Sequence, residues 1–283
     1  MENITYHIAP PDWTPEDPNP FTADGYYGSE WSCLYIWEGN DHGTKRGRKK
    51  KTGLLTCVKG RGVPRLAADL ADYIRYEFLH GRQCIISIPP DMGKIFIERA
   101  LAVTPEWSVI RSHDPKWIVH STTVHGWAAI QACGELKSQA RLHSEGVAIP
   151  NHGSEWFGEP EDYTEYIIMG DTGAEDTELV VASHLSDLKI EDRRAPYTPG
   201  ARLFLDAHRL ISDGLVVRDG IHVAKVYDHL PLDPYLIAAV TPADIDPKGK
   251  ITVWTPRTFC LATLKYFSGI VGEVVPYEHL ENG

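Results

Sequence analysis

A histidine followed by small hydroxyl residues is the first feature of the chain that could do chemistry. His120 stands near the end of a predicted strand, and Ser121 and Thr122 follow it directly. A histidine leaving a strand beside hydroxyl groups can hydrogen-bond a ribose hydroxyl while backbone groups bind a carboxamide. Tyr163 or Tyr166 could stack on a planar ring bound there. The alternative for each of these side chains is ordinary packing.

Three residues further along the chain could also take part in chemistry. Arg218 supplies positive charge, and His184 and His222 can transfer protons. Arg218 is always charged and can bind a phosphate through two parallel hydrogen bonds. We expect His184 and His222 on neighbouring strands, where an imidazole acts as an acid, a base or a polar clamp. Both could instead be plain strand residues, and Arg218 could pair with the adjacent Asp219 across a tight turn.

The familiar catalytic motifs are absent from the sequence. It contains no G-x-S-x-G, no H-E-x-x-H, no phosphate-binding P-loop and no paired C-x-x-C. The histidines His113, His120 and His125 lack the i, i+4 spacing of two metal ligands on a helix. We therefore expect no metal site.

Composition describes a soluble globular protein of one large or two modest domains. The chain has 283 residues, 42% hydrophobic, with 28 Lys+Arg against 39 Asp+Glu and a net charge of −11. No apolar stretch approaches the ~20 residues of a membrane helix, and the first residues lack the pattern of a signal peptide. The five cysteines are odd in number and far apart, so we expect reduced, buried thiols and a cytoplasmic protein.

One basic run stands out in this acidic chain. The run either forms a solvated loop or contacts the phosphates of a nucleic acid. The second alternative rests on the fact that clustered cations release counterions from a polyanion. A glycine-containing junction at 59–65 could likewise cradle a phosphate or simply form a tight turn. The residues of the basic run are Lys45, Arg46, Arg48, Lys49, Lys50 and Lys51.

Residues 1–115 are predicted to contain a small α/β unit. After an irregular leader, the pattern predicts a strand at 53–58, a helix at 63–80 and a strand at 82–88. A helix at 91–102 and a strand at 107–110 follow.

Residues 116–283 are predicted to form a second domain, which makes the class α+β. A strand at 117–123 leads into a helix at 124–133 that Gly134 closes. Residues 140–178 look like a mostly irregular insertion with an ordered segment at 162–169. Strands are then expected at 178–183, 201–205, 221–226, 236–240, 251–254 and 273–276, with helices at 207–212 and 256–268.

Several short motifs in residues 116–242 resemble, in order and spacing, the ADP-ribosyltransferase superfamily. The closest-looking branch is the tRNA 2′-phosphotransferase family, with its H-G-T strand, H-V-H-L-S strand, Asp-ending strand and F-R-S-x-N-G-V strand. The matching segments are His120-Ser-Thr122, Ser183-His-Leu-Ser186, Phe204-Leu-Asp206, Arg218-Asp-Gly-Ile221 and His229-Leu-Pro231, with Ile130 and Gly134 also in register.

The resemblance implies a split β-sheet domain and an enzyme that consumes NAD. Such an enzyme cleaves the nicotinamide–ribose bond and transfers ADP-ribose to a phosphate or base of a nucleic acid, or to a protein. A hydrolase of NAD and a non-catalytic nucleic-acid or nucleotide-binding protein are the alternatives. The expected NAD-binding residues are His120, Ser121, Thr122, Tyr166 and His184. The expected catalytic residues are His120, Arg218 and His222.

Overall fold

The chain is a mixed α/β protein that divides into two compact units. The computed structural model describes residues 6–14, 17–37, 45–49, 52–59, 63–88, 102, 106–150, 152–153, 156, 159–273 and 275. Unit 1 comprises Met1–Glu106, Ile149–Glu165 and Arg218–His222. Unit 2 comprises Trp107–Ala148, Tyr166–Val217 and Val223–Gly283.

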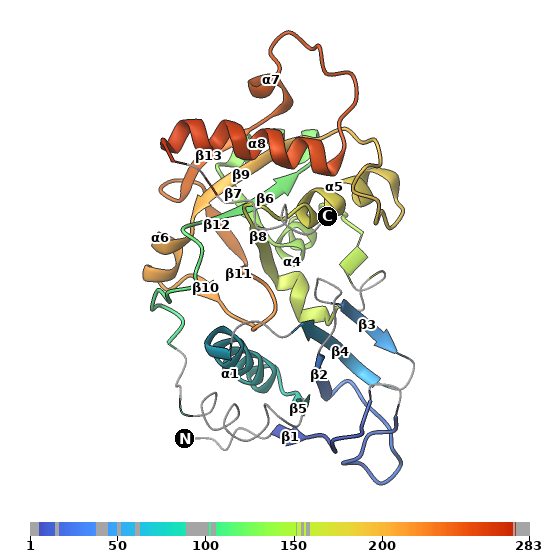
Figure 1. Ribbon diagram of the computed structural model, residues 1–283. Helices are drawn as coiled ribbons and strands as arrows, with labels where there is room; N and C mark the ends of the chain where they lie inside the picture. Colours follow the sequence, from blue (N-terminus) through green and yellow to red (C-terminus); the bar gives the residue numbers. More distant parts are fainter. Residues whose placement is uncertain are drawn as a thin grey trace. The chain divides into compact units, whose positions relative to one another are not determined.

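Unit 1 contains a five-stranded, mostly parallel sheet with the strand order β1-β5-β2-β4-β3 (Figure 1). Only β3 runs antiparallel to its neighbour among the described strands. Helix α1 connects β4 to β5, the usual crossover between parallel strands. The elements are β1 (Tyr6–Ile8), β2 (Trp31–Trp37), β3 (Lys45–Lys49), β4 (Thr52–Lys59), α1 (Val63–Leu79), β5 (Gln83–Ser87) and the 3-10 helix η2 (Glu161–Glu165).

The segment Arg218–His222 packs against helix α1 within unit 1. Ile221 joins the core cluster that contains Leu70 and Tyr73 of the helix. Gly220 has φ +70, and a Cβ at this position would overlap the carbonyl oxygen of Asp69. The backbone of the segment therefore approaches the helix more closely than any side chain would allow.

Replacing Gly220 should disrupt this packing. We expect Gly220→Ala to lower the free energy of unfolding by about 1–3 kcal/mol more than a positive-φ control, because the new methyl group overlaps backbone. The control is Gly214→Ala, where φ is +73 and nothing lies within 4 Å; it should cost about 1–2 kcal/mol through strain alone. Urea denaturation measures both, and equal losses would contradict the close approach.

Unit 2 contains a six-stranded sheet with the order β10-β11-β8-β6-β9-β13 and a two-stranded sheet of β7 and β12. The strands are β6 (Trp117–Thr122), β7 (Glu135–Lys137), β8 (Tyr166–Asp171), β9 (Ala201–Asp206), β10 (Val216–Val217), β11 (Ala224–Tyr227), β12 (His229–Pro231) and β13 (Leu236–Val240). The helices are α3 (Val124–Cys133), α4 (Gln139–Ser144), α5 (Asp176–Ser186), α6 (Ala207–Ser212), α7 (Pro242–Ile245) and α8 (Pro256–Val271).

The six-stranded sheet is nearly divided at its centre. Strands β6 and β8 pair through two residue pairs in the described chain, Ile118 with Asp171 and Val119 with Gly170. The next residues of β6, from His120 to Thr122, pair with β9 on the other side. The sheet thus consists of a β10-β11-β8 part and a β6-β9-β13 part joined over a short stretch.

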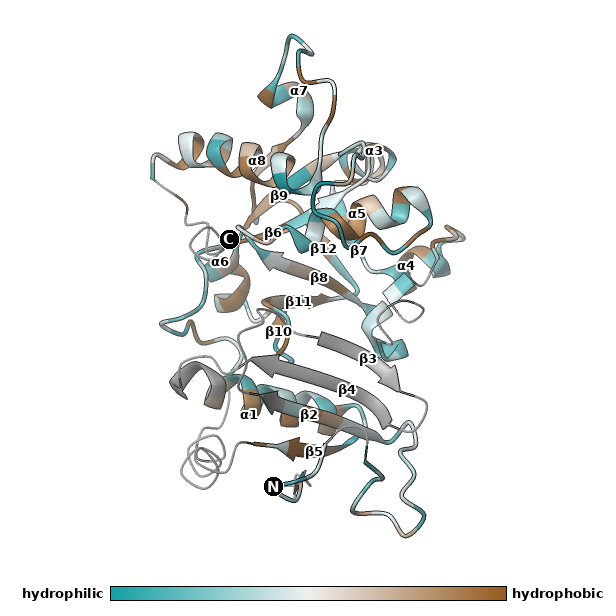
Figure 2. Ribbon diagram, turned by 45° about the vertical axis from the view of Figure 1, so that its right-hand side comes forward, coloured by the Kyte–Doolittle hydropathy of each residue, from teal (hydrophilic) through white to brown (hydrophobic). Residues whose placement is uncertain are grey.

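Two apolar clusters cover the two faces of this sheet. One contains Ile118, Leu203 and Met169, together with helix α6 residues such as Leu210. The other lies under helix α8, where the rings of Phe204 and Phe267 stack with their centroids 4.0 Å apart. Hydrophobic residues predominate along β8 in Figure 2, as expected for a strand inside a core.

Most of the predicted elements are confirmed, but several segments differ. The stretch 178–183 belongs to helix α5, whose buried residues Glu178, Val181 and Ala182 recur at helical spacing. Residues 107–110 form a turn, and Val109 and Ile110 are exposed. The expected strand at 251–254 is reduced to one bridge between Trp254 and Tyr197.

Two further expected strands, at 221–226 and 273–276, differ from the structure. The strand expected at 221–226 is β11 and begins at Ala224, because the preceding residues pack on α1. Glu273 and Val275 are not in a strand, and the rest of the segment expected at 273–276 lies outside the described residues, as does the helix expected at 91–102 apart from Ala102.

The basic run is a strand for most of its length. Residues Lys45–Lys49 form β3, which pairs with β4 in an antiparallel hairpin, so the expected loop is wrong over these residues. Strand β3 lies at the edge of the five-stranded sheet, where its backbone pairs with β4. Lys50 and Lys51 lie outside the described residues.

Candidate functional site

His120 lies where strands β6 and β8 separate. It directly follows the last residue of β6 that pairs with β8. Its ring nitrogen Nδ1 lies 3.3 Å from the carbonyl oxygen of Ile168, across the gap between the strands. Burial lowers the pKa of His120, and this effect exceeds the opposing effects of the Ile168 hydrogen bond and the Glu178 charge. The imidazole is therefore neutral at pH 7 and can donate and accept hydrogen bonds.

Ser121, the next residue, faces the opposite side of the sheet and takes part in a buried polar network. Its hydroxyl donates a hydrogen bond of 2.5 Å to Oε1 of Glu178 on helix α5. Arg202 pairs directly opposite Ser121 on β9, and its Nη1 donates to the same carboxylate oxygen at 2.8 Å. Neither Arg202 nor Glu178 is more than 1% exposed at its side chain. The hydroxyl of Ser121 thus supports the strand and does not lie beside the imidazole.

The same guanidinium also bonds the turn between β8 and α5. Its Nη2 donates to the carbonyl oxygens of Thr172 and Ala174, both at 3.0 Å, and its Nη1 donates to the hydroxyl of Thr177 at 2.9 Å. Burial disfavours the charged form of Arg202, but Cys260 and Glu178 raise its pKa above the ordinary value. One side chain therefore connects β9 with β6, α5 and the turn after β8.

Tyr197 completes the network from the loop between α5 and β9. Its phenol donates a hydrogen bond of 2.6 Å to Oε2 of Glu178. Burial raises the pKa of Tyr197 far above its ordinary value, and the charge of Glu178 adds to this effect. The phenol consequently keeps its proton, and Glu178 accepts from a serine, a tyrosine and an arginine.

The residues after Ser121 are fixed by close backbone packing. Thr123 caps helix α3, and its hydroxyl accepts a 3.0 Å hydrogen bond from the backbone N–H of Gly126. Gly200, at the end of the loop that contains Tyr197, lies against the backbone of Thr122 and Thr123, where a Cβ would overlap their backbone atoms. This contact requires glycine.

A methyl group at position 200 should damage the site. We expect Gly200→Ala to lower the free energy of unfolding by about 1–3 kcal/mol, because the rigid backbone of Thr122 and Thr123 must move. The matched control is Gly269→Ala in helix α8, where nothing lies within 4 Å; alanine should raise stability there by up to about 1 kcal/mol. Thermal unfolding of the two variants tests this, and a neutral Gly200→Ala would contradict the close contact.

Two of the expected NAD-binding residues lie elsewhere on unit 2. His184 is exposed near the end of helix α5, so its expected place on a strand is wrong; the helical spacing of its neighbours decides the conformation. Tyr166 lies on the face of β8 opposite Ile167 and Met169. Its ring contacts the Nζ of Lys225 and the ring of Tyr227.

Arg218 and His222 lie in unit 1, with Asp219 between them. Nδ1 of His222 is 2.6 Å from Oδ2 of the fully buried Asp219 carboxylate. Oδ1 accepts the backbone N–H groups of Ile221 and His222 at 3.0 and 2.8 Å. His222 also packs edge-on against the ring of Tyr163. The carboxylate orients the imidazole in the manner of an acid–base pair, and the sequence had suggested Arg218, not His222, as the partner of Asp219.

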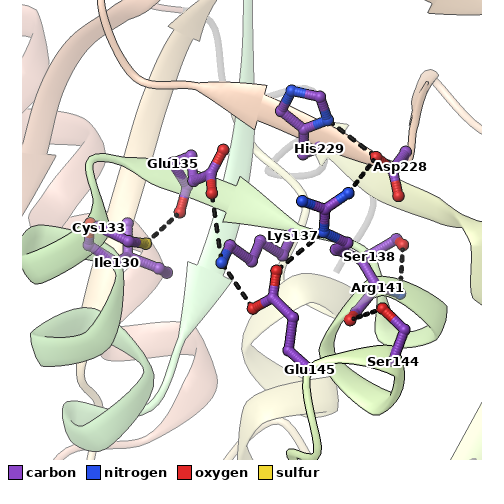
Figure 3. Close-up of polar contacts among 10 residues, drawn as sticks. All are labelled: Ile130, Cys133, Glu135, Lys137, Ser138, Arg141, Ser144, Glu145, Asp228 and His229. Carbon is purple, nitrogen blue, oxygen red and sulfur yellow. Dashed lines mark hydrogen bonds and ion pairs between the residues drawn. The ribbon is translucent and has the colours of Figure 1, made fainter.

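A second polar cluster covers the two-stranded sheet of unit 2 (Figure 3). Glu145 accepts hydrogen bonds from Lys137 at 2.7 Å and from Arg141 at 2.8 Å. Arg141 also donates to Asp228, which lies 2.9 Å from Nδ1 of His229. The cations of this cluster already bind carboxylates, so it offers little free positive charge for an anion.

Cysteines and metal ligands give no further site. Cys33, Cys84 and Cys260 are buried free thiols, whereas Cys133 is exposed, contrary to the expectation of burial. Cys133 ends a surface helix with no buried residue, and its thiol donates to backbone carbonyl oxygens at that end. In the part of the chain that the structure describes, no three His, Cys, Asp or Glu residues are grouped to hold a metal.

The sequence missed the residues of the buried network other than Ser121. A charged residue near the start of an otherwise apolar strand, Arg202 before Leu203 and Phe204, was the available signal. A buried arginine requires a partner, but the sequence did not indicate which carboxylate supplies it. The sequence predicts a strand at 178–183, which places Glu178 on a strand and not on the helix where the structure has it.

Comparison with known proteins yields no match to a family model, a curated protein or a solved structure. Among the described residues, no helix has both the length and the apolar character needed to cross a membrane.

The lowered pKa of His120 has a measurable consequence. We expect its imidazole to titrate below 6.5, the ordinary histidine value, because burial disfavours the charged ring. As the pH falls through this range, the unfolded chain binds the proton first, so His120 lowers folding stability in acid and not at neutral pH. NMR titration of the labelled ring measures the pKa, with His120→Asn to assign the signal. A value at or above 6.5 would contradict the burial.

Proposed function

We propose that the chain is an NAD-dependent transferase that cleaves the nicotinamide–ribose bond and transfers ADP-ribose to a phosphate or base of a nucleic acid. The single observation that carries this proposal is the position of His120. It stands at the point where the central sheet of unit 2 divides, and a neutral imidazole there can bind a ribose hydroxyl.

The arrangement of unit 2 supports an ADP-ribosyltransferase-like split sheet. The two parts of its six-stranded sheet join through two residue pairs beside His120. The strand that carries His120 leads directly into helix α3, which ends at Gly134 with φ +75, as the resemblance implies. The segment 183–186, matched by its sequence to the family's middle strand, lies on helix α5 and therefore does not support the proposal.

In this proposal NAD supplies the bond that breaks between its nicotinamide nitrogen and ribose C1′. Nicotinamide leaves with the bonding electron pair, and the acceptor atom bonds to C1′ and loses its proton. His120 orients the ribose, with Nδ1 occupied by the Ile168 carbonyl and Nε2 available for a hydroxyl. Positioning of the sugar supplies much of the rate, because positive charge develops on the ribose as nicotinamide departs.

An imidazole whose pKa is lowered by burial and the neighbouring hydroxyl of Thr122 fit a nicotinamide riboside group chemically. They bring no cation that would repel the developing positive charge on the sugar. The buried network below the strand fixes the backbone that carries both residues. An acceptor that carries a proton also requires a base to remove it.

Release of nicotinamide from NAD tests the proposal. Mass spectrometry would follow it without acceptor and with 2′-phosphorylated RNA, single-stranded DNA, bulk tRNA or cell lysate. We expect release that depends on a nucleic-acid acceptor and falls at least 100-fold in His120→Ala, because orientation of the sugar is lost.

The matched control is His125→Ala, an exposed histidine on the adjacent helix α3, which should retain full activity. Release without any acceptor would indicate an NAD hydrolase. No release from folded protein would contradict the transferase and favour the non-catalytic binding protein.

A further inference from the structure

We infer that Glu178 is a positioning residue for His120: its buried carboxylate fixes the end of strand β6 on which the imidazole stands. This inference rests on the proposed function for its kinetic part. Glu178 itself contacts neither the ring of His120 nor, in our proposal, the substrate. It acts through Ser121, the residue that follows the histidine.

The carboxylate receives hydrogen bonds from three separate parts of unit 2. Ser121 donates from β6 at 2.5 Å, Arg202 from β9 at 2.8 Å and Tyr197 from the loop after α5 at 2.6 Å. All three distances are within the range of strong, charge-assisted hydrogen bonds. A carboxylate bound in this way fixes the relative positions of the groups that donate to it.

This bonding occurs where the sheet itself gives little support. Beyond Val119, strand β6 pairs with β9 but no longer with β8 in the described chain. Arg202 replaces the missing pairing, because it binds both Glu178 and the turn that follows β8 through Thr172 and Ala174. The distance between His120 and the Ile168 carbonyl therefore depends on the network.

The carboxylate of Glu178 also interacts electrostatically with His120. Its negative charge favours the protonated imidazole and partly offsets the effect of burial. Within the described residues it is the charged side chain that acts on this ring; the other partner, the Ile168 carbonyl, is uncharged. The signal of His120 consequently reports on Glu178 without any substrate.

Two variants test the inference. Glu178→Gln keeps the shape of the side chain and removes its charge, and Tyr197→Phe removes one donor and leaves the Arg202 ion pair intact. We expect Glu178→Gln to lower kcat for nicotinamide release about 10-fold or more, with KM for NAD changed less than 3-fold, because His120 is misplaced in the transition state. Tyr197→Phe should lower kcat in the same way but less.

The matched control is Glu175→Gln. Glu175 is a buried carboxylate at the start of the same helix and forms ion pairs with Arg193 at 3.4 Å and Arg257 at 3.9 Å. This variant should leave kcat and the His120 signal unchanged. If Glu178 acts through His120, then Glu178→Gln should cause no further loss in a His120→Ala background. An equal loss in both backgrounds indicates general destabilisation and would overturn the inference.

NMR of the His120 ring separates this inference from the proposed function. Glu178→Gln should shift the ring signal and lower the pKa of His120, and Tyr197→Phe should shift the signal even if Glu178→Gln does not fold. If the wild-type protein turns over NAD but the folded variants keep the same His120 signal and the same kcat, the inference is overturned and the proposed function is not. Absence of wild-type turnover together with shifted signals would overturn the transferase and leave the positioning role established.

Discussion

The buried ion pair of Arg202 and Glu178 is the interaction on which the rest of unit 2 depends. Both side chains are removed from water, and their charges are balanced by each other and by neighbouring hydroxyl and carbonyl groups. Loss of one partner in such a pair commonly costs about 3–5 kcal/mol, because the other charge stays buried without compensation. Four segments of chain must therefore keep their relative positions for this pair to exist.

The pair stands beside the weakest part of the sheet. A sheet joined over two residue pairs has few backbone hydrogen bonds at its centre. Side-chain bonding from Arg202 makes up for part of this deficit and allows the strands to separate where His120 stands. An opening in a sheet exposes unpaired backbone groups to a ligand, which a continuous sheet does not. The same local geometry thus gives both the structural weakness and the candidate site.

The sequence predicted the elements whose conformation follows from the spacing of their own apolar residues and from the residues that end them. Helix α3 follows from its apolar spacing and the closing Gly134, and β9 follows from Leu203 and Phe204. The prediction was wrong where contacts between residues far apart in the sequence decide the conformation. The segment containing Val181 looks like a strand because of its β-branched residues, but it packs as a helix through Glu178 and its partner Arg202. His120 could be singled out from its neighbours, whereas the network below it joins residues up to 81 positions apart, Ser121 and Arg202.

Unit 1 is built from three stretches of chain that the sequence of unit 2 interrupts, and the chain passes from one unit to the other at five points. Asp162, the partner of Arg82, and Ile221, a member of the α1 core, both come from the later stretches. A fragment ending at residue 115 would therefore lack part of its own core and one of its ion pairs. During synthesis, unit 1 cannot complete itself until the chain has been extended through His222, so the amino-terminal unit is finished late, and neither unit can be exchanged between proteins as a single contiguous cassette.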